Sequence, residues 1–269
     1  MENKFACIIL DLEPDHASIA AESYDGFAPK KIKALLKVLG KYQARLSIFA
    51  VAKTLKQEAV VKLLLKNKAE FHLHSYSHNL REPDSKKEIV MGDKLFSKIF
   101  HHHSLGYRAP RGLISNRGLR LLKTFGFKFD SSVIPSFWPI PKYFLWPNKP
   151  FFLPNGLLEI PFSTITPFRL AISLSWIRFV GWRFYKFCFR IFPSPNPLLF
   201  SFHLHDIWRL PAYHKLSLPW KILYANNAKN GTKTIEDILK YLTRGNYKLI
   251  TIGQLAERLI QKKSSKPNQ

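Results

Sequence analysis

Residues 6–15 read ACIILDLEPD, an apolar run that ends in acidic residues. The run predicts a buried strand over residues 6–10 whose carboxyl end opens onto a site. Alternate side chains of an extended chain point to the same side, so the side chains of Asp11 and Glu13 are expected to lie on the same side of the strand. Two neighbouring carboxylates repel each other unless a cation or a proton separates them. The pair therefore suits a metal ligand beside a general base.

Segments with strand and helix character alternate along the rest of the chain. Further strands are predicted over residues 45–51, 70–74, 106–109, 127–130, 157–161, 198–204 and 247–252. Helices are predicted over residues 32–39, 54–66, 86–99, 116–124, 232–241 and 254–260. This alternation is typical of βα units, so we expect an α/β fold around a mainly parallel sheet or barrel.

Length and composition favour one large domain. The chain has 269 residues, 46% of them hydrophobic, which is enough for a well-buried core. We expect a single catalytic domain over residues 1–262 and a disordered polar tail over residues 263–269. Cys7 and Cys188 lie in apolar surroundings and are expected to be buried thiols. The N-terminus lacks the apolar core of a signal peptide, so we predict a cytoplasmic protein, peripheral at the inner membrane face.

The charge is strongly basic. Lys and Arg number 42 against 18 Asp and Glu, a formal net charge of +24. Nucleic acid, an anionic membrane or an acidic substrate would each explain this balance, as would a solvated basic surface. The basic residues are dispersed and carry no nucleic-acid-binding signature, so we expect no nucleic acid. An anionic membrane remains the favoured partner.

An insertion over residues 135–197 is rich in Pro, Phe and Trp and poor in acids. Within it, residues 168–192 are long enough to span a bilayer, but five basic residues interrupt them. Mixed aromatic and basic character is typical of a helix that lies in the membrane interface. The alternative is a helix packed on the barrel whose Arg side chains extend to solvent.

Four later segments supply further polar groups after apolar runs. His74 and His78 are four residues apart and could bind one metal if that stretch turns as a helix. With a carboxylate they would form a His₂/carboxylate set with open positions for water and substrate. Arg108 could orient a carboxylate through paired hydrogen bonds, and Asp130 supplies another carboxylate. His203 and His205 share one face of an extended chain, so their spacing does not distinguish them.

In this order, the five segments resemble the polysaccharide deacetylase family, also called the NodB-homology family of carbohydrate esterases. The matching segments are the first acidic pair, the His74–His78 motif, RAPRG over residues 108–112, DS over residues 130–131 and LHD over residues 204–206. The resemblance implies a distorted (β/α) barrel that holds one divalent metal ion, often zinc. It also implies hydrolysis of the linear amide bond of an N-acetylated sugar.

The resemblance further implies roles for individual residues. Asp11 would be the general base, and the acidic residue that follows it would bind the metal with His74 and His78. Arg108 would hold Asp11 in place. Asp130 would support either that arginine or the late histidine, which would protonate the leaving amine.

The first motif departs from the usual family pattern of two adjacent aspartates. Here Asp11 and Glu13 are separated by Leu12, which is similar to a branch with an acid-x-acid motif. Glu13 is therefore our choice of metal ligand, with Asp15 as the alternative. The late histidine that acts as acid is either His203 or His205.

The substrate predicted from these features is an N-acetylated glycan, lipid-linked or a cell-envelope precursor, at the cytoplasmic membrane face. One alternative is a deacetylase of soluble chitooligosaccharide or of peptidoglycan. A second is a non-catalytic, membrane-associated sugar-binding protein with the same fold. Four tryptophans around the late motifs offer faces on which a sugar could stack: Trp138, Trp146, Trp208 and Trp220.

Overall fold

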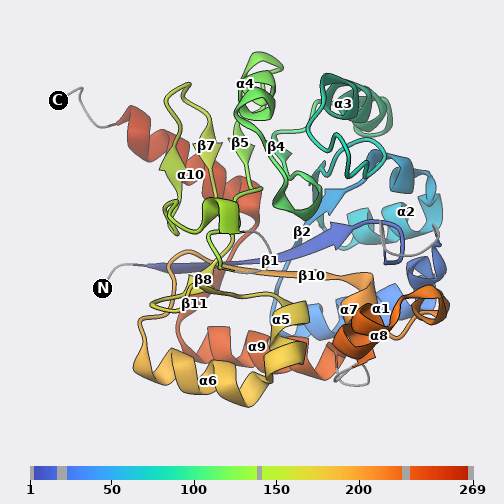
Figure 1. The fold of residues 1–269 in the computed structure, drawn as a ribbon, viewed down its shortest axis with the longest axis vertical. Coiled ribbons are helices and arrows are strands. Elements are labelled where there is room, and N and C mark those ends of the chain that lie inside the picture. The colour runs from blue at the N-terminus through green and yellow to red at the C-terminus, as the bar shows by residue number, and fades with distance from the viewer. Residues whose placement is uncertain (1–2, 17–22, 138–140, 226–230, 266–269) are drawn as a thin grey trace.

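A curled, mainly parallel sheet forms the centre of the computed structural model, which describes residues 3–16, 23–137, 141–225 and 231–265 (Figure 1). The strand order is β10-β1-β2-β3-β4-β5-β7-β6, and β11 also pairs with β1. The strands are β1 (Lys4–Leu12), β2 (Leu46–Ala50), β3 (Glu70–Leu73), β4 (Gly106–Tyr107), β5 (Phe129–Asp130), β6 (Phe151–Phe152), β7 (Leu158–Glu159), β8 (Thr164–Ile165), β9 (Leu170–Ala171), β10 (Leu198–His203) and β11 (Tyr247–Leu249).

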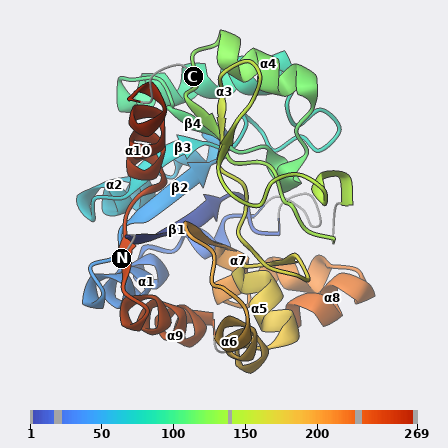
Figure 2. The same ribbon diagram turned by 90° about the vertical axis from the view of Figure 1, so that its left-hand side faces the viewer.

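Helices surround this sheet, as two views at right angles show (Figure 2). The α-helices are α1 (Pro29–Lys41), α2 (Glu58–Lys66), α3 (Lys86–Phe100), α4 (Asn116–Thr124), α5 (Leu174–Val180), α6 (Trp182–Ile191), α7 (Leu204–Ile207), α8 (Leu218–Ala225), α9 (Gly231–Arg244) and α10 (Ile252–Ser264). Short 3₁₀ helices cover Asp25–Phe27, Ala52–Lys56, Pro110–Gly112, Pro141–Tyr143 and Pro211–Lys215.

The sheet is a half-barrel. Its path ends at β10 on one side and at β6 on the other, and these two strands do not pair within the described residues. Every pairing along the path is parallel except the one between β6 and β7. The α/β prediction and the distorted (β/α) barrel that the family resemblance implied are both confirmed.

The alternation of side chains along β1 creates two buried layers. Ile8 and Leu10 belong to the large core cluster that also includes side chains of α1, α2 and α9. Cys7 and Ile9 belong to a second, smaller cluster with side chains of α10. Because side chains alternate along a strand with a period of two residues, the side chain of Asp11 lies on the same side of the sheet as those of Cys7 and Ile9.

The insertion over residues 135–197 contains short strands and two helices. The single helix predicted within residues 168–192 is divided: β9 comes first, and α5 and α6 are separated at Gly181. Gly181 has φ 103°, a backbone conformation that side chains with a Cβ rarely adopt, so the helix cannot continue through it. Among the described residues, no helix is long and apolar enough to cross a bilayer.

Most predicted elements are present with boundaries shifted by a few residues. The helix predicted over residues 54–66 is a 3₁₀ turn followed by α2. The short helices α7 and α8 and the β8–β9 hairpin were not predicted. At the C-terminus, α10 continues to Ser264, so the first residues of the predicted tail are helical, and residues 266–269 lie outside the described part of the chain.

Candidate active site

Carboxyl ends of neighbouring strands bring the candidate residues together. In the parallel pairing of β1 with β10, Asp11 lies opposite His203. His74 directly follows β3, and Arg108 directly follows β4. Because parallel strands end at the same edge of a sheet, segments separated by almost 200 residues converge there.

Glu13, His74 and His78 converge at a single point. Oε2 of Glu13 lies 2.7 Å from Nε2 of His78 and 3.6 Å from Nε2 of His74. All three side chains are buried, and one ligand atom of each lies within 4.8 Å of the others. A carboxylate and two imidazoles form a donor set that suits zinc and similar divalent metals.

The loop that carries the histidines is not helical, which corrects the assumption behind their four-residue spacing. Ser75 and His78 have φ of 65° and 61°, in the left-handed region. Glu88 of α3 holds the loop, because its carboxylate accepts hydrogen bonds from the backbone N–H groups of Tyr76 and Ser77. A loop clamped in this way brings the two rings together without a helical turn.

The orientation of the His74 ring is fixed by a backbone carbonyl on the side away from Glu13. Its Nδ1 lies 2.8 Å from the carbonyl oxygen of Arg108, to which it can donate. With the proton on Nδ1, Nε2 carries the lone pair that faces Glu13. Backbone or carboxylate acceptors that fix the tautomer in this way commonly accompany metal-binding histidines.

Asp15 lies apart from the histidine pair. Its Oδ2 accepts hydrogen bonds from the backbone N–H of Gly26 at 2.9 Å and from the hydroxyl of Ser23 at 3.2 Å. Burial raises its pKa to about 6 in spite of these hydrogen bonds. Of the two carboxylates considered as ligand, Glu13 is therefore the one that contacts His74 and His78.

Arg108 is buried and holds Asp11. Its Nη1 lies 2.9 Å and 3.2 Å from the two carboxylate oxygens of Asp11. Its Nε and Nη2 donate to the carbonyl and hydroxyl oxygens of Ser131. The rings of Phe49 and Phe162 lie 4.4 Å and 4.2 Å from the guanidinium carbon. The guanidinium plane is thereby fixed, and with it the direction of the Asp11 carboxylate.

His203 faces the acidic pair. Its Nε2 lies 3.7 Å from Oδ2 of Asp11 and 3.9 Å from Oε1 of Glu13. Its Nδ1 lies 2.9 Å from Oδ2 of Asp206, which also accepts from the backbone N–H of His203. Burial lowers the pKa of His203, but the negative charges of Glu13, Asp206 and Asp11 outweigh burial and raise it to about 10.

His205 lies in α7 and stacks against His203. The two ring centroids are 4.7 Å apart and the planes differ by 9°. The ring of His16 also stacks on that of His205, with ring centroids 4.7 Å apart. Burial first, and the charge of His203 second, lower the pKa of His205 to about 3. Burial likewise lowers the pKa of His16 to about 4. The stack therefore consists of one cationic and two neutral rings at neutral pH.

Asp130 has partners other than those expected for it. Its carboxylate accepts hydrogen bonds from the backbone N–H and the hydroxyl of Ser132. It also pairs with the carboxyl group of Glu159 in β7. Burial raises the pKa of Glu159 well above its usual range, and the negative charge of Asp130 raises it further. Within the described residues, Asp130 makes no direct ion pair with Arg108 or with a late histidine. The charge of Asp130 nevertheless favours the charged form of Arg108, so its support of the arginine is electrostatic.

Sequence reasoning missed several of these residues. Glu159 interrupts an otherwise apolar strand, and that interruption was the available signal. Ser201, which accepts from Arg108 at 3.2 Å, and the two phenylalanines around the guanidinium had no signal of their own. Of the four tryptophans, Trp220 stacks on Tyr224, whose ring contacts His205, whereas Trp138 lies outside the described residues.

Comparison with known proteins gives one matching family model. Residues 14–129 match the family model described as polysaccharide deacetylase. Over this range the chain is similar to the polysaccharide deacetylase family. The matched range contains His74, His78 and Arg108 of the site, while Asp11, Glu13 and His203 lie outside it. No curated protein matches the sequence.

Solved structures share the fold of this chain at low sequence identity. A putative polysaccharide deacetylase from Mycobacterium smegmatis is 14% identical with a TM-score of 0.62, over 100% of this chain and 94% of that one. The Puue allantoinase is 13% identical with a TM-score of 0.61, over 94% and 88%. The peptidoglycan deacetylase PdaC from Bacillus subtilis is 16% identical with a TM-score of 0.56, over 98% and 94%.

Proposed function

We propose that this protein is a metal-dependent deacetylase that removes the N-acetyl group of a lipid-linked sugar at a membrane surface. One observation carries the proposal: the buried Glu13–His74–His78 cluster lies beside a carboxylate, Asp11, that is clamped by Arg108 and faced by His203. A ligand set, a base and an acid thus share one site.

The residues present fit a single divalent metal ion, with zinc as the first choice. Glu13, His74 and His78 would hold it. Three protein ligands that leave coordination positions open are typical of catalytic rather than structural zinc. When bound, such an ion polarises a carbonyl oxygen and lowers the pKa of water to about 7.

The chain's own groups would supply the proton transfers. Asp11 accepts the proton of the water that adds to the amide carbonyl carbon, and Arg108 keeps its carboxylate aimed at that water. His203 donates a proton to the sugar nitrogen as the carbon–nitrogen bond breaks. Acetate and a free amine result. Asp206 holds Nδ1 of His203 and so directs Nε2 towards the reacting atoms. Within the described part of the chain, His203 and not His205 forms ion pairs with Asp11 and Glu13, so we assign the acid to His203.

Two features of the surface support a membrane-bound substrate. The first is the net charge of +24, which attracts the protein to anionic lipid. The second is α6, where the exposed apolar residues Phe184, Phe187 and Ile191 run beside the exposed basic residues Arg183, Lys186 and Arg190. Such a face can rest in the headgroup region with its charges towards lipid phosphates.

Acetate release from a panel of N-acetyl sugars tests the catalytic proposal. The panel contains lipid-linked sugars, chitooligosaccharide and peptidoglycan fragments, each with zinc or with chelator. We expect metal-dependent release that is fastest on lipid-linked sugars and absent in Asp11→Asn, with the exposed Asp25→Asn as control. Equal rates in Asp11→Asn and the wild type would contradict the assigned base. Preference for soluble glycans would favour the alternative substrates, and no release from any of them would favour a non-catalytic sugar-binding protein.

Sedimentation with anionic vesicles at low salt tests the membrane contact. Replacement of Arg183, Lys186 and Arg190 by Gln is expected to weaken binding by about 100-fold, since each basic residue near the surface contributes about 1 kcal/mol. The control replaces Lys30, Lys33 and Lys37 of α1 in the same way and removes the same charge elsewhere. An equal loss in both triple variants would mean that α6 is not the contact face.

A further inference from the structure

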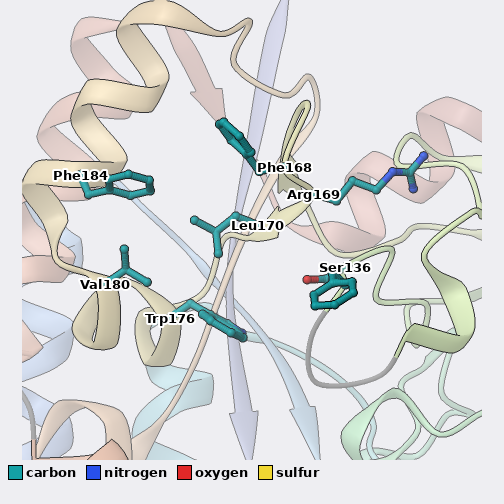
Figure 3. A pocket seen from close by; sticks show the side chains of 8 residues that line it. Ser136, Phe168, Arg169, Leu170, Trp176, Val180 and Phe184 are labelled. Carbon is teal, nitrogen blue, oxygen red and sulfur yellow. The ribbon is translucent and has the colours of Figure 1, made fainter.

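A pocket of about 350 Å³ lies between the loop that follows β5 and the helices α5 and α6, a volume within the range of small-molecule sites. Figure 3 shows Val180 and Phe184 on one side, Ser136 on the opposite side and Leu170 between them. Nearly all of the lining is apolar. The lining residues are Ser136, Phe137, Phe168, Arg169, Leu170, Trp176, Val180 and Phe184.

The pocket is open to the exposed apolar face of the insertion. Phe137 and Phe168, which line it, are 68% and 60% exposed. Phe184 lines it as well and begins the row on α6 that continues through Phe187 and Ile191 at helical spacing. Continuous apolar surface therefore leads from the exposed row into the pocket. A hydrocarbon chain could extend from the row into the pocket along apolar side chains.

The chain segment that forms the pocket carries almost only positive charge. Between Asp130 and Asp206 the only acidic residue is Glu159, which is fully buried. Arg169 lies at the pocket, and its guanidinium points away from the apolar lining, where Nη1 donates to the carbonyl oxygen of Trp146 at 2.7 Å. Arg183 and Lys186 are exposed on the adjoining helix. Such surroundings favour a ligand that combines an apolar chain with a negative head.

The pocket also adjoins the candidate active site. Trp176 lines it, and the preceding residue, Ser175, donates a hydrogen bond of 2.7 Å to Oδ1 of Asp206. Asp206 in turn holds His203. Helix α5 thus forms a wall of the pocket on one side and supports the proposed acid on the other.

From this geometry we propose that the pocket binds the hydrocarbon chain of the substrate, an N-acetyl sugar joined through phosphate to a membrane lipid. The inference rests on the proposed function and assigns the site that would hold the lipid part of its substrate. The chain lies against Leu170, Trp176 and Val180, the phosphate faces the basic residues, and the sugar reaches the site beyond α5. A second copy of this protein is a poor occupant, because it would bring another +24 charge to a basic surface.

Chain-length dependence of the reaction tests the proposal. The substrates are N-acetylhexosamine 1-phosphate esters with short, medium and long alkyl chains, used below the concentration at which they form micelles. We expect kcat/KM to rise by up to about fourfold per added methylene while the chain still enters the pocket, and then to level off. A value of kcat/KM that does not depend on chain length in the wild type would overturn the proposal, even with the deacetylase activity intact.

Matched variants locate the effect. Val180→Trp fills the pocket, Phe168→Ser removes an exposed lining residue, and Ile191→Trp alters the same apolar face outside the pocket. The first two are expected to flatten the chain-length dependence, so that kcat/KM no longer rises with the length of the alkyl chain. Ile191→Trp is expected to keep the wild-type dependence. Equal dependence in all four proteins would overturn the proposal.

Binding without turnover separates this inference from the proposed function. A bromine-labelled alkyl phosphate should quench tryptophan fluorescence, and Trp176→Phe should lose most of that quenching. Quenching without acetate release from any substrate would refute the deacetylase but keep a pocket for anionic lipid chains. Quenching by brominated vesicle phospholipid alone, with none by the alkyl phosphate or the lipid-linked sugar, would identify bulk membrane lipid as the occupant and overturn the substrate assignment.

Discussion

Arg108 reaches both carboxylate oxygens of Asp11 with a single guanidinium nitrogen, at 2.9 Å and 3.2 Å. Its remaining nitrogens donate to Ser131, and the rings of Phe49 and Phe162 lie 4.4 Å and 4.2 Å from its guanidinium carbon. The arginine therefore cannot rotate without loss of several contacts at once. It fixes the orientation of Asp11 through shape as well as through charge.

Arg108→Lys should abolish this fixation although the positive charge is kept. A lysine ammonium lacks the planar fork, so the two oxygens of Ser131 lose their donors at a cost of about 1–3 kcal/mol for each unsatisfied buried group. We expect a lower free energy of unfolding in urea and a fall in kcat of about 100-fold. The control is Arg111→Lys, an exposed residue of the same loop. Wild-type kcat in Arg108→Lys would contradict a positioning role.

The choice between Glu13 and Asp15 as metal ligand can be tested by zinc titration calorimetry. Glu13→Gln should weaken zinc binding by at least about 100-fold, because even the outer hydrogen-bond partners of metal ligands are worth about 10–100-fold. Asp15→Asn should bind zinc like the wild type, since an amide oxygen can still accept from Gly26. Loss of zinc in Asp15→Asn alone would reverse the assignment.

His203 and His205 should respond differently to replacement by phenylalanine. His205→Phe keeps a flat ring between His203 and His16, so kcat should stay within about threefold. His203→Phe removes the proposed acid and should lower kcat by about 100-fold to 10,000-fold. Retained zinc binding in both variants, measured by calorimetry, shows that the ligand set is intact. The opposite order of effects would mean that His205 is the acid.

Glu70 links β3 to the start of α10 and makes stability depend on pH. Its Oε2 accepts from the backbone N–H of Gly253 at 2.9 Å and lies 3.0 Å from Nε2 of His72. Burial raises the pKa of Glu70, but the hydrogen bond and charge of His72, helped by Gly253, lower it below 4.5. The pKa of Glu70 is lower in the folded than in the unfolded protein. Ionised Glu70 therefore stabilises the fold above about pH 4.5, and this stabilisation is lost as the pH falls below that value.

Glu70→Gln should therefore remove part of the acid sensitivity. At neutral pH the variant is expected to lose about 1–2 kcal/mol of unfolding free energy, since a charge-assisted hydrogen bond is replaced by a neutral one. At about pH 3.5 the difference from the wild type should shrink. Urea unfolding at both pH values measures this, with the exposed Glu257→Gln of α10 as control. A difference that does not change with pH would contradict the assignment.

Much of the fold was predictable from local sequence pattern. The apolar run before Asp11 and the alternating segments after it fixed the strand and helix order, because side-chain periodicity is a local property. Gly181 marks a place where the local sequence pattern predicted the wrong structure. Residues 168–192 have helical composition throughout, and one backbone angle divides them into α5 and α6.

The sequence by itself determined which residue types stand after each strand, and hence that carboxylates, histidines and an arginine would meet at one edge of the sheet. Only the tertiary structure decided which atoms meet: Glu13 rather than Asp15 beside the histidines, His203 rather than His205 beside Asp11, and Glu159 rather than Arg108 beside Asp130. These choices depend on contacts between segments far apart in the chain. Such contacts follow from strand register and loop geometry, which no local pattern specifies.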